Sequence, residues 1–260
     1  MKKISFFLLS FLILFPIEQL FAWGQEGHRI IGQIAYNHLS PKAKENIDQI
    51  LGEKGVVYWA NWADEIKSDT IYANSYNWHF QDLNGGMSDS SLTATLVNYP
   101  QEGGNLFKVM DSLITVLRNE PDNFDALRFI IHLAGDKFCP MHMGHFDDLG
   151  GNKIKLQWFG RNSTLHKVWD SDLIYSRGYS YSEYAEYLEH RYHRMAQEIE
   201  KMSEAEILIQ NYHITQEIYD YHKIWDGNSY HYIYHFTDTM EKQLYRSGIR
   251  LAKLLNELYG

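Results

Sequence analysis

Residues 124–137, a predicted helix, constrain the fold more than any other part of this sequence, because their stretch 129–134 is apolar on nearly every side of a helix. Within them, the run 129–134 is interrupted by a single polar residue, His132. A helix that is hydrophobic around its whole circumference is stable only when other elements enclose it. We therefore predict a central helix, capped at its start by Asp122, inside a globular core.

Most of the remaining chain also carries the three- and four-residue spacing of helices. Further helices are predicted over residues 24–39, 41–51, 106–117, 164–174, 182–202, 203–222 and 230–258. Strand-like alternation is confined to residues 153–159, which could form a small hairpin, and the polar stretch 84–104 is predicted to be a loop. The sequence contains no internal repeat and no interdomain linker. It therefore predicts an all-α fold, a single compact helical domain over residues 23–260 with a small hairpin and long loops.

The composition excludes several classes of protein. The 260 residues are 45% hydrophobic and 22% charged, which excludes a disordered chain or a coiled coil. The formal net charge of −9 argues against a protein that follows duplex DNA with a broad basic face. A single cysteine excludes an internal disulfide framework.

Residues 1–22 are predicted to be a signal peptide. Two lysines near the start precede an apolar run over residues 4–17, and the small residue Ala22 suits cleavage by signal peptidase. The alternative is an uncleaved membrane anchor, but the run is short for a bilayer span and no stop-transfer pattern follows. Cleavage after Ala22 would make Trp23 the first residue of an exported protein, either periplasmic or secreted.

Histidine and aspartate recur at a spacing that suits metal binding. Positions i and i+4 share one face of a helix, so a His-x-x-x-Asp pair can present both side chains to one ion. The sequence contains three such pairs, namely His132/Asp136, His166/Asp170 and His222/Asp226. About one pair would arise by chance, so context has to separate them. Asp136 falls in the most apolar helix, where a metal would compensate its charge. The His222/Asp226 pair is better explained as the solvated end of a helix.

Other histidines and aspartates lie near aromatic residues or turns. His28 is expected one turn into the first helix, and His142 follows a helix-ending proline that would turn it back toward Asp136. Asp64 and His79 each lie beside aromatic residues. Taken singly, each of these residues is more often structural than a ligand.

Taken together, these segments resemble the S1/P1 nucleases, a family of zinc-dependent single-strand nucleases and 3′-nucleotidases. The matching segments, in order, are Trp23-Gly24-x-x-Gly27-His28, Trp62-Ala63-Asp64, His79-Phe80-x-Asp82, His132-x-x-Gly135-Asp136, Pro140-x-His142 and Leu165-His166-x-x-Trp169-Asp170. The resemblance runs by motif from Trp23 to Asp170, and the helical remainder fits the family's fold.

The resemblance implies three zinc ions (Zn²⁺) per chain. It assigns Asp64, His79, His132 and Asp136 to the first ion, His142, His166 and Asp170 to the second, and His28, Asp136 and the amino and carbonyl groups of Trp23 to the third. Neutral imidazole and carboxylate are ordinary zinc ligands, and catalytic sites keep positions open for water. A metal-activated hydroxide would attack phosphorus, with Asp64 and Asp136 in catalytic positions and no protein nucleophile.

The implied substrates are single-stranded DNA and RNA, cleaved to 5′-phosphorylated products, and 3′-nucleotides. Three zinc ions would make the pocket locally positive on a negative protein, so one phosphate could bind without a basic track. Phe80 would stack on a neighbouring base and Asp82 would hydrogen-bond to it; the alternative for Phe80 is a core aromatic. Fungal members carry an arginine where this chain has Lys67, which we expect to contact the phosphate as a point charge.

Several residues receive no catalytic role. Cys139 is interpreted as a buried packing residue, and the fungal disulfides are absent. His145, Asp147 and Asp148 are predicted at the rim of the cleft without an assigned function. Residues 230–235 have the histidine spacing of zinc proteases but lack the glutamate, so that class is rejected.

Two other functions compete with a nuclease. A zinc-dependent phospholipase C would use a related fold and a similar trinuclear site. The short spacing from Trp23 to His28, the aspartate at position 170 and the His79-Phe80-x-Asp82 segment favour the nuclease. The second alternative is a metal-storing or carbohydrate-binding module of the cell envelope, against which the complete ligand sets argue. The resemblance implies no stable protein partner, and a monomer is expected.

Overall fold

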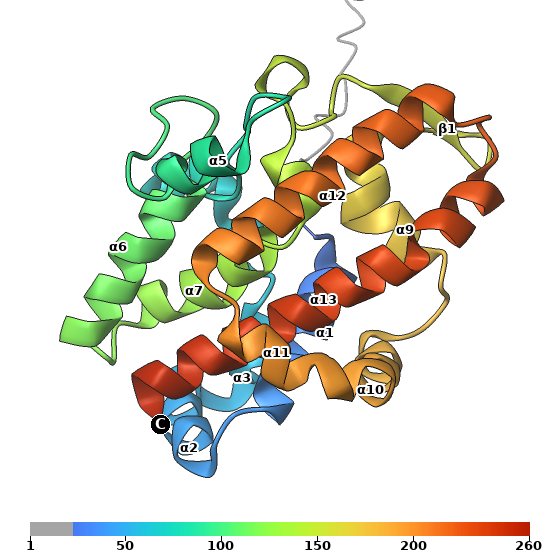
Figure 1. Ribbon diagram of the computed structural model, residues 1–260. Coiled ribbons are helices and arrows are strands. Elements are labelled where there is room, and N and C mark those ends of the chain that lie inside the picture. Colours follow the sequence, from blue (N-terminus) through green and yellow to red (C-terminus); the bar gives the residue numbers. More distant parts are fainter. Residues whose placement is uncertain (1–22) are drawn as a thin grey trace, which may run out of the picture.

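The computed structural model describes residues 23–260, and the predicted signal peptide lies outside the described residues. The described chain is almost entirely helical, as predicted (Figure 1). Its α-helices are α1 (Gln25–Asn37), α2 (Pro41–Leu51), α3 (Gly55–Trp59), α4 (Trp62–Glu65), α5 (Asp89–Thr95), α6 (Leu106–Asn119), α7 (Phe124–Asp136), α8 (Leu165–Lys167), α9 (Leu173–Tyr175), α10 (Tyr181–Tyr192), α11 (Ala196–Lys201), α12 (Glu204–Ile224) and α13 (Ser229–Tyr259). Tighter 3₁₀ turns lie at η1 (Gly52–Lys54), η2 (Ile66–Ser68), η3 (Thr70–Trp78), η4 (Pro140–Met143), η5 (Phe146–Asp148) and η7 (His193–Met195), and η6 (Val168–Asp172) is a π-helical turn.

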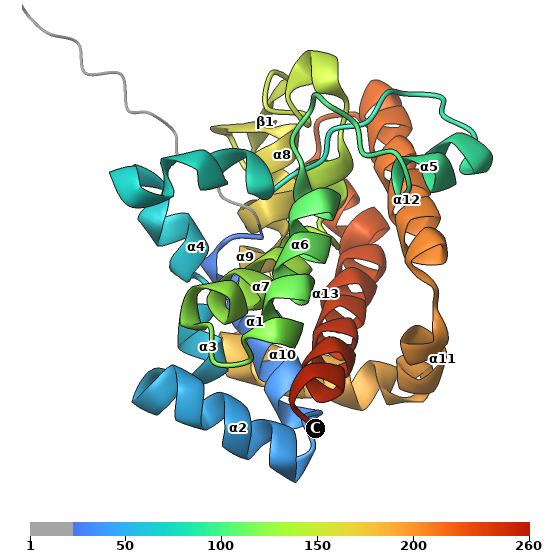
Figure 2. The same cartoon turned by 90° about the vertical axis from the view of Figure 1, so that its left-hand side faces the viewer.

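Helix α7 is the centre of the fold, as its sequence predicts. Every residue from Ala126 to Asp136 is buried. The helix packs against α6, α13, α4 and α1, and Figure 2 shows it enclosed by these elements. Because α7 carries His132 and Asp136, both side chains lie in the buried interior of the molecule.

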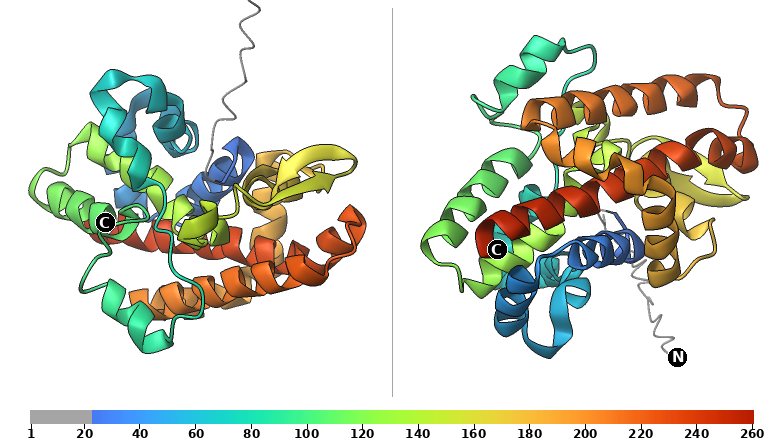
Figure 3. Two further views of the ribbon diagram at one scale, coloured as in Figure 1. Left: turned by 90° about the horizontal axis from the view of Figure 1, so that it is seen from above. Right: turned by 60° about the horizontal axis from the view of Figure 1, so that its bottom comes forward.

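Helix α1 forms the second layer of the core. Its apolar face, which includes Ile30, Ile31 and Ile34, is fully buried. The helix packs along α13 and against α10 and α3, and the blue α1 runs beside the red α13 in the right panel of Figure 3. This packing brings the start of α1, with His28, to the centre of the protein.

Several helix boundaries follow from local capping. Ser40 accepts a hydrogen bond from the Ala43 N–H ahead of a first-turn proline, as predicted for α2. Ser203 and Glu206 form a capping box at the start of α12. The α7 cap differs from the prediction, because the Asn123 side chain accepts from the Ala126 N–H. Asn123 precedes the first helical residue directly, whereas Asp122 lies one position too early.

Two other predicted segments also differ from the structure. The polar stretch 84–104 contains the short helix α5, because Ser88 caps its start by accepting from the Ser91 N–H. The helix predicted over residues 182–202 begins at Tyr181 and is broken at His193–Met195. Short helices inside polar sequence and breaks inside helical sequence both depend on packing that periodicity does not report.

The predicted hairpin is present and small. Strand β1 (Lys155–Trp158) pairs antiparallel with β2 (Arg161–Thr164), with Lys155 opposite Thr164. The turn residues Phe159 and Gly160 have φ values of 48° and 75°, as a two-residue hairpin turn requires. The hairpin lies at the end of the molecule opposite α2 (Figures 1 and 2). No helix in residues 23–260 has an apolar stretch that could cross a bilayer.

Candidate metal centre

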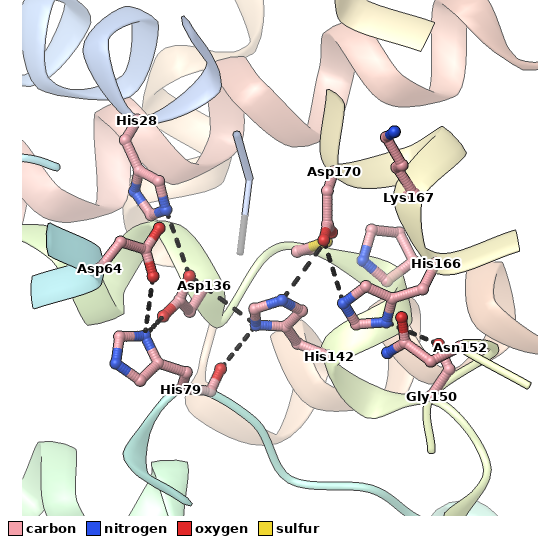
Figure 4. A network of polar contacts seen from close by, with 12 residues as sticks. His28, Asp64, His79, Asp136, His142, Gly150, Asn152, His166, Lys167 and Asp170 are labelled. Atoms are coloured by element: carbon pink, nitrogen blue, oxygen red, sulfur yellow. Dashed lines mark hydrogen bonds and ion pairs between the residues drawn. The ribbon is translucent and has the colours of Figure 1, made fainter. Parts of the chain in front are cut away.

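The predicted ligands converge on one buried region, although they come from widely separated parts of the chain. Most of them are drawn in Figure 4. Eight of the predicted ligands would bind through their side chains, and each of these residues is at most 7% exposed. They are His28 (α1), Asp64 (α4), His79 (after η3), His132 and Asp136 (α7), His142 (η4), His166 (α8) and Asp170 (η6).

Asp136 is the centre of the first cluster. Its Oδ2 lies 2.9 Å from Nδ1 of His79 and 3.2 Å from Nε2 of His132. Its Oδ1 lies 3.3 Å from Nε2 of His28 on the other side. The same oxygen is 3.7 Å from Nδ1 of His142, which belongs to the second cluster. One carboxylate therefore contacts imidazoles from four segments, the geometry expected of a bridging ligand.

Asp64 completes the first cluster. Its Oδ1 lies 3.6 Å from Nε2 of His132 and 3.7 Å from Nδ1 of His79. The same oxygen is 2.6 Å from Nζ of Lys67, one turn along the chain. Asp64, His79 and His132 thus present three donor atoms to a common point, with a lysine beside the carboxylate.

Asp170 is the centre of the second cluster. Its Oδ2 lies 3.0 Å from Nε2 of His166, the i, i+4 pair that the sequence predicts. Its Oδ1 lies 3.8 Å from Nε2 of His142 and accepts a hydrogen bond from the Cys139 thiol at 3.4 Å. Asp170 sits in a π-helical turn, a distortion that is frequent at functional sites.

The compact donor sets differ from the predicted ligand sets in two respects. Within residues 23–260, three sets of donor atoms lie within 4.8 Å of one another, namely His28/His132/Asp136, Asp64/His79/His132 and Cys139/His142/Asp170. In the first, His132 joins His28 and Asp136, although the prediction assigns it to the first ion alone. In the third, Cys139 takes the place expected for His166. Cys139 is fully buried, as predicted, but it also contacts a candidate ligand rather than apolar side chains alone.

Backbone carbonyls orient three of the imidazoles. The Nδ1 atoms of His132, His142 and His166 lie 2.6, 2.6 and 2.7 Å from the carbonyl oxygens of Ala60, His79 and Gly150. A carbonyl oxygen only accepts, so each Nδ1 carries a proton, and in the neutral ring Nε2 keeps a lone pair. These lone pairs face the aspartates, which is the outer-sphere arrangement typical of metal-ligating histidines.

Buried polar atoms without hydrogen-bond partners indicate whether the site suits a cation. Within the described chain, neither ring nitrogen of His28 makes a hydrogen bond, and neither does Oδ1 of Asp136, although Nε2 and Oδ1 lie 3.3 Å apart. Both residues are fully buried. Unpaired buried polar atoms are costly, and a divalent cation bound between them would remove the penalty.

The protonation states also suit metal ligands. Burial lowers the pKa of His79 to about 4 and also lowers the pKa values of His28 and His142. Burial acts to raise the pKa of Asp136, but the neighbouring His132 and His142 outweigh it and hold the pKa well below its usual range. The neutral imidazoles of His28, His79 and His142 can bind zinc directly. Burial acts to lower the pKa values of His132 and His166, but Asp136 and Asp170 outweigh it and raise them, so these two rings must lose a proton before they bind zinc.

Close packing explains why glycine occupies position 135. A Cβ atom there would lie 2.8 Å from Nδ1 of His28, closer than side-chain packing allows. The glycine therefore lets α1 bring His28 against α7. The start of α1 is anchored by the Gly24 N–H, which donates to the Asp170 carbonyl at 2.5 Å, and the adjacent Trp23 is fully buried.

A cleft of about 450 Å³ opens beside the two clusters. Its lining includes the predicted substrate-contacting residues Lys67, Phe80 and Asp82 together with His79, His142 and His166. Phe80 is half-buried, and its ring meets Tyr76 edge-on at 6.2 Å. Burial raises the pKa of Asp82 to about 8, so this side chain can also donate a hydrogen bond near neutral pH.

The sequence analysis did not predict four further residues that line the cleft. Tyr76, Asn105, Lys108 and Asn152 line it. The polar residues that open α6 directly after Gly103-Gly104 are the one signal that could have suggested Asn105 and Lys108.

The residues predicted at the rim do not line this cleft. His145 and Asp148 contact Tyr219 instead, and the Asp147 carbonyl accepts a hydrogen bond from Lys153. The remaining His-x-x-x-Asp pair is separate from the metal clusters, as expected, because Asp226 pairs with the exposed His231.

Comparison with known proteins decides the family. The S1/P1 Nuclease family profile matches residues 23–260. The chain belongs to the S1/P1 nuclease family. Endonuclease 3 of Arabidopsis thaliana is 25% identical over 99% of this chain and 96% of its own length. Endonuclease 2 of the same plant is 28% identical over 62% of this chain and 59% of its own length. Nuclease S1 of Aspergillus oryzae is 28% identical over 62% of this chain and 58% of its own length.

These matches confirm the predicted family and its all-α fold. The alignments with Endonuclease 2 and nuclease S1 span less than two thirds of those proteins, whereas the alignment with Endonuclease 3 spans nearly the whole of it. Membership of the S1/P1 nuclease family therefore extends over all the described residues, including the C-terminal helices that carry no predicted ligand.

Proposed function

We propose that this member of the S1/P1 nuclease family is a zinc-dependent phosphodiesterase. It cleaves single-stranded DNA and RNA to 5′-phosphorylated products and removes the 3′-phosphate from nucleotides. The observation that carries the proposal is the position of Asp136, whose two oxygens lie within 3.3 Å of His28, His79 and His132 in a buried site. The adjoining cleft gives a phosphodiester access to this site.

Three zinc ions fit the donor groups. The first would be held by Asp64, His79, His132 and Asp136, the second by His142, His166 and Asp170, and the third by His28, Asp136 and the amino and carbonyl groups of Trp23. The unpaired atoms of His28 and Asp136 and the carbonyl-oriented imidazoles support these assignments. Bound zinc would supply Lewis acidity and lower the pKa of water toward neutrality.

The protein's own groups orient and balance this chemistry. Asp64 and Asp136 hold their histidines by contacts of 3.7 Å or less, so the donor atoms are arranged before any ion arrives. The carbonyls of Ala60, His79 and Gly150 keep three imidazoles in the correct tautomer. Preorganised groups of this kind need no rearrangement as charge develops on the phosphate. No side-chain nucleophile is required.

Substrate selection follows from the cleft. A half-buried Phe80 ring can stack on an exposed base without regard to sequence, and Asp82 can hydrogen-bond to that base. A base inside a duplex is already stacked and paired, so single strands are favoured. Lys67 adds a positive charge beside the scissile phosphate.

We also propose that the protein is exported and that it is a monomer. Cleavage after Ala22 would create the amino group of Trp23, and the mature domain would then comprise residues 23–260. The buried position of Trp23 beside the Asp170 turn supports a role for the new terminus. A single-strand nuclease assembled only after export would spare cytoplasmic RNA.

The decisive experiment is a product assay on the chain that begins at Trp23. Single-stranded DNA, RNA, a 3′-nucleotide, duplex DNA and phosphatidylcholine vesicles are each incubated with and without a zinc chelator. We expect chelator-sensitive release of 5′-phosphorylated fragments from both single strands, release of phosphate from the 3′-nucleotide and slow attack on the duplex.

A matched pair of variants controls the assay. His132→Ala should abolish cleavage, whereas His213→Ala, at an exposed histidine paired with Asp89, should leave it unchanged. Hydrolysis of phosphatidylcholine alone would replace the proposal with a phospholipase C. Chelator-resistant cleavage would exclude the zinc mechanism.

A further inference from the structure

A strained loop over residues 144–152, the Gly150 loop, supplies the carbonyl that orients His166. The Gly150 oxygen lies 2.7 Å from Nδ1 of His166, and Figure 4 shows these groups side by side. Leu149, Gly150 and Gly151 follow one another with φ values of 56°, 60° and 83°. A left-handed backbone is unfavourable for leucine, so such a loop persists only when surrounding contacts hold it.

Tyr219 of α12 contacts the Gly150 loop at two points. Its hydroxyl donates to Oδ1 of Asp148 at 2.8 Å and accepts from the His145 N–H at 3.0 Å. The same Asp148 oxygen accepts from the Gly151 N–H at 2.6 Å. Burial raises the pKa of Tyr219, which keeps its hydroxyl a donor. A continuous set of hydrogen bonds thus links α12 to the residue next to Gly150.

The loop has little space for any other arrangement. A Cβ atom on Gly150 would lie 2.5 Å from the Met141 carbonyl oxygen, and one on Gly144 would lie 2.5 Å from Cα of Gly150. The Tyr219 ring covers the loop from the other side by stacking on His145 at 3.9 Å with a 2° angle between the planes. Close packing, the Gly150 N–H bond to the His145 carbonyl at 3.0 Å and the contacts of Asp148 with Gly151 and Tyr219 together hold the Gly150 carbonyl in place.

We propose that Tyr219 is a positioning residue of the metal centre. Through Asp148 it holds the Gly150 carbonyl against Nδ1 of His166, which keeps the Nε2 lone pair directed at the second zinc beside Asp170. The inference rests on the proposed function in one respect, that His166 binds zinc. Tyr219 itself contacts neither the metal nor the substrate.

Tyr212 offers a matched control on the same helix. It lies two turns before Tyr219, and its hydroxyl also makes two hydrogen bonds, donating to the Asn84 carbonyl at 2.7 Å and accepting from the Met87 N–H at 2.9 Å. Both tyrosines are buried. Tyr212→Phe and Tyr219→Phe therefore remove similar hydrogen bonds, but only Tyr219 is linked to His166.

The first test is zinc release to a competing chelator, measured on the chain that begins at Trp23. Changes in the outer sphere of a metal site typically weaken metal binding by 10–100-fold. Because Tyr219 acts one link further out, we expect Tyr219→Phe to lose one zinc ion at a chelator concentration about tenfold lower than wild type. Tyr212→Phe should release zinc like wild type, even if both variants melt at a lower temperature.

The second test does not depend on zinc. Nitrogen-15 NMR of the metal-free chain, recorded at a pH high enough to keep His166 neutral, should give a single Nδ1–H tautomer for His166 in the wild type and in Tyr212→Phe, and a mixture in Tyr219→Phe. A double-mutant cycle extends the first, zinc-release test: Tyr219→Phe should add little to the zinc loss of Asp148→Ala, because both act through the same contact.

Distinct results would overturn the two proposals. Identical zinc release and an identical His166 tautomer in Tyr219→Phe, Tyr212→Phe and wild type would refute the role of Tyr219. A wild-type chain that binds no zinc would refute the proposed function instead, while the NMR comparison would still decide whether Tyr219 positions His166.

Discussion

The ammonium group of Lys67 lies 2.6 Å from Oδ1 of Asp64, so a residue that lines the substrate cleft also contacts a candidate zinc ligand. The Lys67 side chain is 18% exposed, which leaves it accessible from the cleft. One lysine is therefore placed both to neutralise a carboxylate of the metal centre and to attract a phosphate.

This position predicts the outcome of changing Lys67. Lys67→Arg should preserve or raise kcat/KM on single-stranded DNA, because a guanidinium can bind phosphate with two hydrogen bonds. Lys67→Met should lower it by at least about tenfold, the loss expected when a charge-assisted hydrogen bond is removed. Steady-state kinetics and zinc content are measured for both. A large loss in Lys67→Arg with normal zinc content would mean that the position serves the structure rather than the phosphate.

The second zinc site predicts a coupled loss of metal and activity. His142→Ala and Asp170→Ala each remove one of the three protein ligands assigned to that ion. Turnover should fall by orders of magnitude, with about one zinc ion fewer per chain. Elemental analysis and far-ultraviolet circular dichroism on the same samples separate metal loss from unfolding. A variant with one zinc ion fewer but full activity would contradict the assignment.

Phe80 should contribute to binding more than to the chemical step. Removal of a stacked ring costs about 1–3 kcal/mol per base, so Phe80→Ala should raise KM for oligonucleotides with a smaller effect on kcat. A phosphodiester without a base is the control substrate and should be hydrolysed at nearly the wild-type rate. Equal losses on both substrates would show that Phe80 maintains the site rather than stacking on a base.

Zinc binding to the metal-free chain should weaken as the pH falls. Burial acts to lower the pKa values of His132 and His166, but the nearby charges of Asp136 and Asp170 outweigh it and raise both above the ordinary value of 6.5. Protonated imidazole cannot bind a metal, so protons compete with zinc once the pH drops through these raised pKa values. Titrations with zinc at several pH values should show proton release on binding. Affinity that does not change across this range would contradict the role of these histidines.

The amino group of Trp23 provides the last prediction. A free amine can bind zinc, whereas the amide nitrogen of a longer chain practically cannot. A chain that begins at Trp23 should hold about three zinc ions, and a chain with one additional glycine before Trp23 should hold fewer and be nearly inactive. The two chains are compared in their zinc content, by elemental analysis, and in their nuclease rate. Equal zinc and equal rates would show that the amine is not a ligand.

Local pattern was sufficient for most of the fold. The apolar run in α7, the Ser40-Pro41 start of α2 and the His132/Asp136 pair all depend on contacts within one turn of helix, which the sequence states directly. The misses were a break at His193–Met195 that helical spacing did not indicate, and the short helix α5, which a local Ser88 cap begins inside a polar stretch.

The sequence by itself predicted the candidate ligands, the His132/Asp136 and His166/Asp170 pairs from their helical spacing and the others from the resemblance to the family. Only the tertiary structure decided how they meet. Asp64 of α4 lies 3.6 Å from His132 of α7, and the Cys139 thiol contacts Asp170 although 31 residues separate them. Tyr219 acts on a loop 71 residues away through Asp148. Such contacts arise from packing between helices, whose free energy depends on the whole core, and no spacing along the chain encodes them.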